Sequence, residues 1–387
     1  MSNRGGASGG EQILSRISQI AGMAAQVGLL GIEFIDLHLA RLARRSPMTM
    51  PLLMFEITRR CNLSCQYCGY PRFYPDYGRE LSTEEVRAIL RDCVDLKTRI
   101  VSFGGGEPFM RPDFIEIVAF ARSLGLNVHI DSNGTMIDEE VVGAIPDGAD
   151  VTIIFSLDHP DADVNDRVRG PGSHAGVTRA ARLLRELRPS ISVGINCVVG
   201  SHNVDCLERM VELADGLGVG GISFLPLHAN LQHQWRFGDD SCVPLVPADP
   251  ETVHRAMLAA TALARSRGLH TNSRRFNSMA AGGPKSRRAF QCWAGYLFGN
   301  IDPYGNLFPC YDIMDKASGV REVGLKAAWR GPGMERLRSR VRRCEADCVS
   351  SGAIEASLRM NPTIVASDPV QLIEDLRFFL GSGRSRR

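Results

Sequence analysis

Residues 59–70 read RRCNLSCQYCGY, a stretch that places Cys61, Cys65 and Cys68 within eight positions and supplies no fourth cysteine. A structural zinc site uses four ligands and a disulfide uses two, so three clustered thiols fit neither arrangement. The spacing predicts a metal centre in which one coordination position stays open. Because an apolar, β-rich run over residues 52–58 comes directly before it, we expect the cysteine loop to follow a buried strand.

The bulk composition is that of a globular enzyme. The chain has 387 residues, which is enough for one large α/β domain and a smaller one. Its formal net charge of +2 gives no global field that would attract nucleic acid, so we expect no nucleic-acid partner. The 11 cysteines show spacings of metal sites and no secretory signal opens the chain, so we expect the reduced thiols of a cytoplasm.

An apolar stretch near the amino terminus, residues 20–32, is shorter than the roughly 20 residues that a membrane-spanning helix needs. Arg41, Arg44 and Arg45 follow it. An apolar helix with a basic flank fits peripheral contact at the inner membrane face. A helix that packs against the main domain or a second subunit fits as well, and both alternatives stay open.

Six short β-rich runs alternate with amphipathic helical stretches. The predicted strands cover residues 52–58, 100–103, 127–131, 151–156, 191–199 and 221–225, and the helices between them include 82–93, 112–124, 174–187 and 203–217. Repeated strand–helix units predict a parallel sheet. Their total length, about 180 residues, is short for an eight-unit barrel. The predicted fold class is therefore α/β, with a partial (β/α)6 TIM-like barrel.

These features together resemble the radical S-adenosylmethionine (radical SAM) superfamily, whose signature is this cysteine spacing after the first strand. Tyr67, just before the last cysteine, fits the signature as well. Further family motifs follow successive predicted strands. They are the amine-binding Gly105, Gly106 and Glu107, the ribose-contacting Ser132 and Asn133, the carboxylate-binding positions at Ser156 and Arg169, and the adenine-contacting Ile195 and Leu225.

The resemblance implies a [4Fe–4S] cluster on Cys61, Cys65 and Cys68, with S-adenosylmethionine bound at the open iron. An electron, supplied by a reductant such as flavodoxin or ferredoxin, then yields a 5′-deoxyadenosyl radical that abstracts a substrate hydrogen. Asp158 is a candidate proton acceptor near that radical. A zinc site or a redox-inert cluster is the alternative interpretation of the three cysteines.

A second set of cysteines follows the predicted barrel, at Cys292, Cys310, Cys344 and Cys348. The first two bracket a predicted hairpin over residues 297–310, and a short helix is predicted over 334–341. The set resembles the twitch or SPASM auxiliary domains of the superfamily, which implies a second, auxiliary [4Fe–4S] cluster. The final C-x3-C spacing departs from the commoner C-x2-C, and a zinc knuckle is the alternative.

The predicted domain order is an N-terminal helical segment (1–48), the barrel (49–235), a connection (236–284), a small hairpin and helix domain for the auxiliary cluster (285–360) and a C-terminal helix and tail (361–387). Residues 1–48 are too short for a leader-binding winged helix, so we expect oxidation of a small-molecule, sugar or lipid-linked substrate. A peptide (RiPP) maturase, an epimerase, an adenosyl-transferring lipid-pathway enzyme and a non-catalytic iron–sulfur electron carrier are the alternatives.

Overall fold

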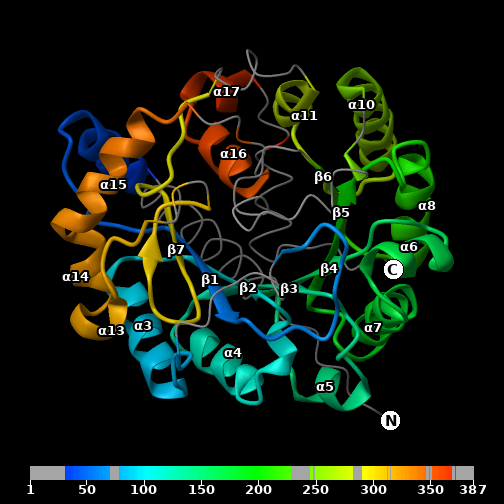
Figure 1. The fold of residues 1–387 in the computed structure, drawn as a ribbon, viewed down its shortest axis with the longest axis horizontal. Helices are drawn as coiled ribbons and strands as arrows, with labels where there is room; N and C mark the ends of the chain where they lie inside the picture. Colours follow the sequence, from blue (N-terminus) through cyan, green and yellow to red (C-terminus); the bar gives the residue numbers. More distant parts are fainter. Residues whose placement is uncertain are drawn as a thin grey trace, which may run out of the picture.

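A curved sheet of eight strands forms the centre of the computed structural model (Figure 1). The structure describes residues 31–69, 78–227, 245–246, 249–281, 290–311, 313, 315–345, 348, 351–367 and 371. The strand order is β6-β5-β4-β3-β2-β1-β7-β8. The strands are β1 (Leu52–Thr58), β2 (Ile100–Gly105), β3 (Asn127–Ser132), β4 (Val151–Ser156), β5 (Ser192–Val199), β6 (Gly221–Pro226), β7 (Phe298–Ile301) and β8 (Leu307–Phe308).

Strands β1 to β6 pair in parallel, each with the next one along the chain, so the six predicted strands are confirmed. Parallel neighbours need long crossover connections, which the intervening helices supply. Side chains alternate between the two faces of each strand. In β2, Val101 and Phe103 are buried in the hydrophobic core, whereas Ser102 and Gly104 lie on the other, concave face and stay partly exposed.

Helices cover the convex side of the parallel sheet, and the remaining helices lie beyond its two edges (Figure 1). Ser82 and Glu85 form a capping box at the start of the helix Thr83–Asp95, with Ser82 Oγ accepting from Glu85 N at 3.3 Å. The helices are α3 (Thr83–Asp95), the 3-10 turn η1 (Pro108–Met110), α4 (Phe114–Ser123), α5 (Glu139–Ala144), α6 (Ala162–Arg169), α7 (Ser173–Leu187), α8 (Leu207–Leu217), α10 (Pro250–Ser266), α11 (Arg274–Ala281), α13 (Val320–Val323), α14 (Leu325–Arg330), α15 (Pro332–Arg342), α16 (Ser351–Leu358) and α17 (Pro362–Ser367).

Helix α8 begins at Leu207, later than the predicted start at residue 203. The cause is the side chain of Asn203, which is fully buried and fixes the loop after β5. Its Nδ2 donates to Asp158 O at 2.6 Å, and its Oδ1 accepts from Gly200 N at 2.9 Å. A residue that caps a loop in this way competes with continuation of a helix.

The predicted hairpin is present as β7 and β8, which pair antiparallel. Asp302 holds its turn, because Oδ1 accepts from Tyr304 N and from Asn306 N, each at 2.9 Å. One feature was not predicted from the sequence. Strand β7 also pairs in parallel with β1, Leu52 opposite Phe298, so the hairpin continues the barrel sheet. The hairpin thereby covers the β1 edge, which would otherwise expose unpaired backbone groups.

Residues 31–42 form a helix that packs on the C-terminal part of the chain. Leu37 and Ala40 lie in one apolar cluster with Trp293 and Tyr296. Arg41 donates from Nη1 to Cys292 O at 2.7 Å and lies over the Trp293 ring, 5.0 Å from its centroid. This packing agrees with the alternative in which the segment contacts the main domain. Among the residues that the structure describes, no helix is long and apolar enough to cross a membrane.

The structure tests neither the predicted domain bounds nor the chemistry of the connection, so the division at residues 48, 235, 284 and 360 stays a prediction. His228, His233, Trp235 and Cys242, which the sequence places in the loop after β6, lie outside the described residues.

Candidate functional site

The loop with Cys61, Cys65 and Cys68 begins where β1 ends and lies against the end of α6. Gln66 N donates to Val168 O at 2.8 Å, and the Cys65 thiol donates to Arg169 O at 3.3 Å. Cys68 N donates to Cys65 O at 3.0 Å, which closes a tight turn between the two thiols. The three cysteines therefore lie in one loop at the carboxyl end of the sheet, where sites of parallel barrels are built.

Cys61 and Cys65 are partly buried, and the sulfur of Cys61 meets N–H donors of the protein. Burial raises the pKa of Cys65 to about 12, and burial also raises the pKa of Cys61. Leu63 N–H bonds to the sulfur of Cys61, and the Asn133 amide lies 4.0 Å from the same sulfur. Hydrogen bonds to sulfur of this kind are typical of cysteines that hold iron–sulfur clusters.

The arrangement of donors also bears on the kind of metal centre. In the part of the chain that the structure describes, no three His, Cys, Asp or Glu side chains converge as ligands of one ion would. In a cubane cluster each thiolate binds a different iron, so the sulfurs are near one another without sharing a centre. Three thiols in one loop are the donor set of a [4Fe–4S] cluster with one open iron, whereas a structural zinc ion takes four ligands.

Gly105 and Gly106 allow the loops after β1 and β2 to touch. A Cβ on Gly106 would lie 2.1 Å from Arg60 O, and one on Gly105, whose φ is +121°, would lie 2.4 Å from Thr58 O. Backbone hydrogen bonds occupy this space instead, since Gly106 N donates to Thr58 O at 2.9 Å and Glu107 N donates to Arg60 O at 2.7 Å. Only glycine permits so close an approach of two backbones.

Glu107 is fully buried and links the loop after β2 to the loop after β3. Its carboxylate accepts from Asn133 N at 2.7 Å, from Ser132 Oγ at 2.9 Å and from Phe109 N at 3.2 Å. Burial raises the pKa of Glu107 to about 7 in spite of these donors. The side chain thus holds Ser132 and Asn133 in place, and in this structure it turns toward β3, away from solvent.

Asp158 is committed to a buried ion pair with Arg169. Arg169 donates from Nε to Oδ2 at 2.7 Å and from Nη2 to Oδ1 at 3.1 Å. Tyr67 Oη donates to Oδ2 at 2.6 Å, and Val198 N donates to Oδ1 at 2.8 Å. Each oxygen accepts two hydrogen bonds, which fills the acceptor capacity of a carboxylate. Asp158 is suited to fixing Arg169 and Tyr67 behind the cysteine loop, and its geometry gives little support to the predicted role of proton acceptor.

Three of the remaining predicted nucleotide contacts lie at the carboxyl ends of their strands, whereas Ile195 lies in the middle of β5 and is buried in the hydrophobic core. Ser132 ends β3, Ser156 ends β4, and Leu225 is the penultimate residue of β6. Asn133 Nδ2 donates to Asn62 Oδ1 at 2.9 Å, so the ribose-contacting position is tied to the cysteine loop. The structure brings the predicted residues of β1, β2 and β3 into one hydrogen-bonded group.

Of the second cysteine set, Cys292, Cys310 and Cys348 are partly buried and Cys344 is exposed. Burial raises the pKa of Cys292, and its sulfur receives hydrogen bonds from Ala294 N–H and the Ser357 hydroxyl. Cys310 directly follows the hairpin, and Cys344 follows α15. The pattern of N–H and O–H donors around a buried thiol again fits a thiolate ligand of a cluster.

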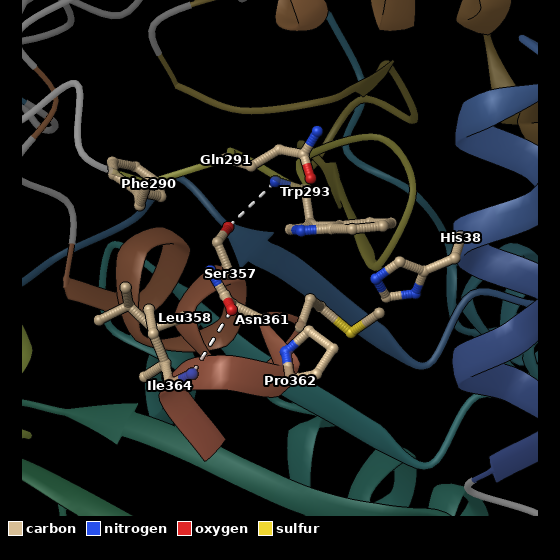
Figure 2. A pocket seen from close by; sticks show the side chains of 10 residues that line it. His38, Phe290, Gln291, Trp293, Ser357, Leu358, Asn361, Pro362 and Ile364 are labelled. Carbon is tan, nitrogen blue, oxygen red and sulfur yellow. Dashed lines mark hydrogen bonds between the residues drawn. The ribbon is translucent and has the colours of Figure 1, made fainter. Parts of the chain in front are cut away.

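Figure 2 shows a pocket of about 150 Å³ that Gln291 and Trp293 help to line. His38 enters it from the N-terminal helix, and Trp293, Ser357 and Asn361 line it from the C-terminal segments. Trp293 N donates to Ser357 Oγ at 3.0 Å. None of the residues of the three-cysteine site lines this pocket, which lies where the two ends of the described chain meet.

Comparison with known proteins decides the family. The model of the radical SAM superfamily matches residues 55–214. The mycofactocin maturase MftC of Mycobacterium ulcerans is 31% identical over 292 residues, which are 74% of this chain and 76% of that protein. The chain belongs to the radical SAM superfamily. Its cofactors are those expected, S-adenosylmethionine and the [4Fe–4S] cluster that binds it, with an auxiliary cluster of the twitch or SPASM kind.

Other radical SAM proteins extend this comparison. The PqqA peptide cyclase of Rhodopseudomonas palustris is 28% identical over 263 residues, which are 67% of this chain and 66% of that protein. The crystal structure of Streptococcus suis SuiB bound to precursor peptide SuiA superposes with a TM-score of 0.63 at 16% identity, over 84% of this chain and 76% of that one. This likeness confirms the predicted partial barrel.

The same comparison corrects the expected partner. A small-molecule, sugar or lipid-linked substrate was expected, and that expectation is wrong. One radical SAM relative is named for the peptide that it cyclises, and the structural neighbour was crystallised with a precursor peptide. The length of the N-terminal segment misled the prediction, because it says nothing about how the barrel itself receives a peptide.

Sequence reasoning missed two polar residues of the concave face, Asp131 on β3 and Asn196 on β5, which contact each other. The available signal was their alternation with buried apolar neighbours in otherwise apolar strands.

Proposed function

We propose that this radical SAM enzyme modifies a peptide by an oxidative reaction that begins with abstraction of a hydrogen from a peptide residue. The observation that carries the proposal is the extent of the similarity. The match to the maturase MftC covers 292 residues, whereas the family model covers residues 55–214, so the similarity is longer than the core of the barrel. The name of the PqqA peptide cyclase supports a peptide as the substrate class.

The residues of the chain have the following parts in this proposal. Cys61, Cys65 and Cys68 hold the cluster that leaves one iron open to S-adenosylmethionine. Backbone carbonyls beside Gly105 and Gly106 receive its amine, since these glycines let the loops approach each other closely. The other proposed contacts are Ser132 and Asn133 for the ribose, Ser156 and Arg169 for the carboxylate, Leu225 for the adenine, and Tyr67 behind the cluster.

The bound group, once reduced, supplies a 5′-deoxyadenosyl radical. The protein must then keep water out and hold the peptide so that one hydrogen faces that radical. The oxidation needs an electron acceptor, and we assign Cys292, Cys310, Cys344 and Cys348 to the auxiliary cluster for this purpose. Loss of two hydrogens from the peptide balances the reaction, one as an atom and the other as a proton and an electron.

The proposal is tested by co-expression of the enzyme with each short peptide that is encoded beside its gene. Mass spectrometry of the recovered peptides measures the change. A loss of two hydrogens that depends on Cys61, Cys65 and Cys68 is expected. An unchanged mass with inverted stereochemistry would indicate epimerisation, and a gain of the adenosyl group would indicate transfer. Modification of none of these peptides, by an enzyme that cleaves S-adenosylmethionine, would contradict the proposal.

A further inference from the structure

Asp131 lies on the concave face of the sheet, where its carboxylate meets two neutral side chains. Asn196 Nδ2 donates to Oδ1 at 3.3 Å, and Ser102 Oγ donates to Oδ2 at 3.5 Å. Asp131 is on β3 and Asn196 is on β5, with β4 between them. Their contact therefore crosses the concave face over β4, which places the carboxylate within the barrel interior and not among the packed helices.

Among the described residues, no cationic side chain pairs with this carboxylate. Asp131 forms no ion pair with any residue that the structure describes. The ionisable group that interacts with it is Glu107, which has the same sign. Burial raises the pKa of Asp131 to about 6. Two long hydrogen bonds from neutral groups do not offset the hydration free energy that a carboxylate loses when it is buried.

Asp131 differs in this respect from Asp158. The Asp158 carboxylate accepts from Arg169, Tyr67 and a backbone amide, so its charge is already neutralised. From the described residues the Asp131 carboxylate accepts two hydrogen bonds, whereas a carboxylate can accept about four. The cost of its burial would fall if a positively charged group entered the concave face.

The neighbouring strand does not crowd the Asp131 carboxylate. Gly104 on the neighbouring strand has no side chain, and a Cβ built there would still lie 3.8 Å from Asp131 Oδ2. Asp131, Ser102 and Asn196 all remain partly exposed. Ser132 directly follows Asp131, so this part of the concave face adjoins the residues proposed to contact the nucleotide.

We propose that Asp131, with Asn196 and Ser102, forms a subsite for an ammonium or guanidinium group of the peptide substrate. The inference rests on the proposed function and names one feature of its substrate. A lysine or arginine side chain, or a peptide amino terminus, would form charge-assisted hydrogen bonds with Asp131. Asn196 and Ser102 keep the carboxylate oriented toward the barrel interior.

The test is a binding selection from a library of random ten-residue peptides. The anaerobically reconstituted enzyme with S-adenosylmethionine is immobilised, and bound peptides are sequenced. Three proteins are compared: the wild type, Asp131→Asn and the control Glu140→Gln, which removes one negative charge from an exposed position on α5. Affinity for S-adenosylmethionine is measured for each protein by calorimetry.

Enrichment of a cationic residue is expected with the wild type and with Glu140→Gln, and its loss is expected with Asp131→Asn. Replacement of that residue by norleucine in a selected peptide should weaken binding to the wild type about tenfold and leave binding to Asp131→Asn unchanged. Peptides selected without a cationic preference would overturn the subsite but leave the proposed function standing. The same conclusion would follow if Asp131→Asn lost affinity for S-adenosylmethionine itself. Selection of no peptide by the wild type would overturn both.

Discussion

Gly106 shows how one residue sets the geometry of this site. The loops after β1 and β2 meet at Gly106. A Cβ at this position would lie 2.1 Å from Arg60 O. Gly104, two residues earlier, has different surroundings, because a Cβ there would meet its nearest atom at 3.8 Å. Position 106 therefore excludes any side chain, whereas position 104 accepts a methyl group.

We expect Gly106→Ala to lower the free energy of unfolding by about 1–3 kcal/mol, since backbone must move to relieve the overlap. The same change displaces the cysteine loop and should lower the iron content. Gly104→Ala is the matched control and should keep both stability and iron. Thermal unfolding and an iron assay measure the two effects. Equal behaviour of the two variants would show that the loops do not depend on this contact.

Glu107 leads to a second prediction at this scale. Replacement by alanine leaves Ser132 Oγ and the Asn133 amide without their acceptor, at a cost of about 1–3 kcal/mol. Because these residues are proposed to contact the ribose, affinity for S-adenosylmethionine should fall roughly tenfold while both clusters remain. Calorimetry under anaerobic conditions measures this, with Glu140→Ala as the control. Unchanged affinity would mean that the link between the loops is not needed for binding.

The sequence indicated which residues gather at the site, but not what each carboxylate does there. Glu107 and Asp158 were both predicted as groups that face a ligand. In the structure both carboxylates are buried, and their oxygens accept hydrogen bonds from protein groups. Asp131 was not singled out, although its charge is the least compensated of the three. The roles depend on contacts between loops of different strands, and a motif read along one strand does not contain them.

At the scale of elements, periodicity located the six parallel strands and the hairpin, because alternation and turn residues are local signals. The pairing of β7 with β1 joins residues about 245 positions apart, as Leu52 and Phe298 show. No local pattern encodes such a register. The hairpin was therefore predicted to belong to the separate domain of the auxiliary cluster. The short helices α5, α6 and α16 were also missed, since few turns give a weak periodicity.

The N-terminal helix gives a prediction that separates packing from membrane contact. Leu37 is 1% exposed and packs with Trp293 and Tyr296, whereas Leu39 is 52% exposed. Leu37→Asp should destabilise the protein by on the order of 4 kcal/mol, because it buries an unpaired charge. Leu39→Asp should leave the thermal midpoint unchanged.

Sedimentation with anionic vesicles completes that comparison. If the exposed side of the helix contacts a membrane, wild-type protein sediments with vesicles and Leu39→Asp does not. If the helix only covers the apolar surface around Trp293, neither protein sediments. A stable Leu37→Asp variant would contradict the packing described here.

The auxiliary cysteines belong to the same scale, since α15 and the hairpin position them. Replacement of Cys344 and Cys348 by alanine should remove about half of the iron, as one of two clusters is lost. Cleavage of S-adenosylmethionine should continue, while formation of the modified peptide should stop for want of an electron acceptor. Iron analysis and chromatography of 5′-deoxyadenosine measure the first two effects. Normal product formation would show that this cluster takes no part in the oxidation.

For the whole molecule, binding of S-adenosylmethionine depends on three loops of one sheet acting together, with Cys61, Cys65 and Cys68 as the centre. The most direct measurement is the 5′-deoxyadenosine formed by anaerobically reconstituted, dithionite-reduced enzyme, alongside its iron content. Wild-type enzyme should contain about eight irons and form 5′-deoxyadenosine. The variant with all three cysteines changed to alanine should retain roughly half of the iron and form none. Undiminished 5′-deoxyadenosine formation by that variant, or a colourless wild type with stoichiometric zinc, would contradict the account.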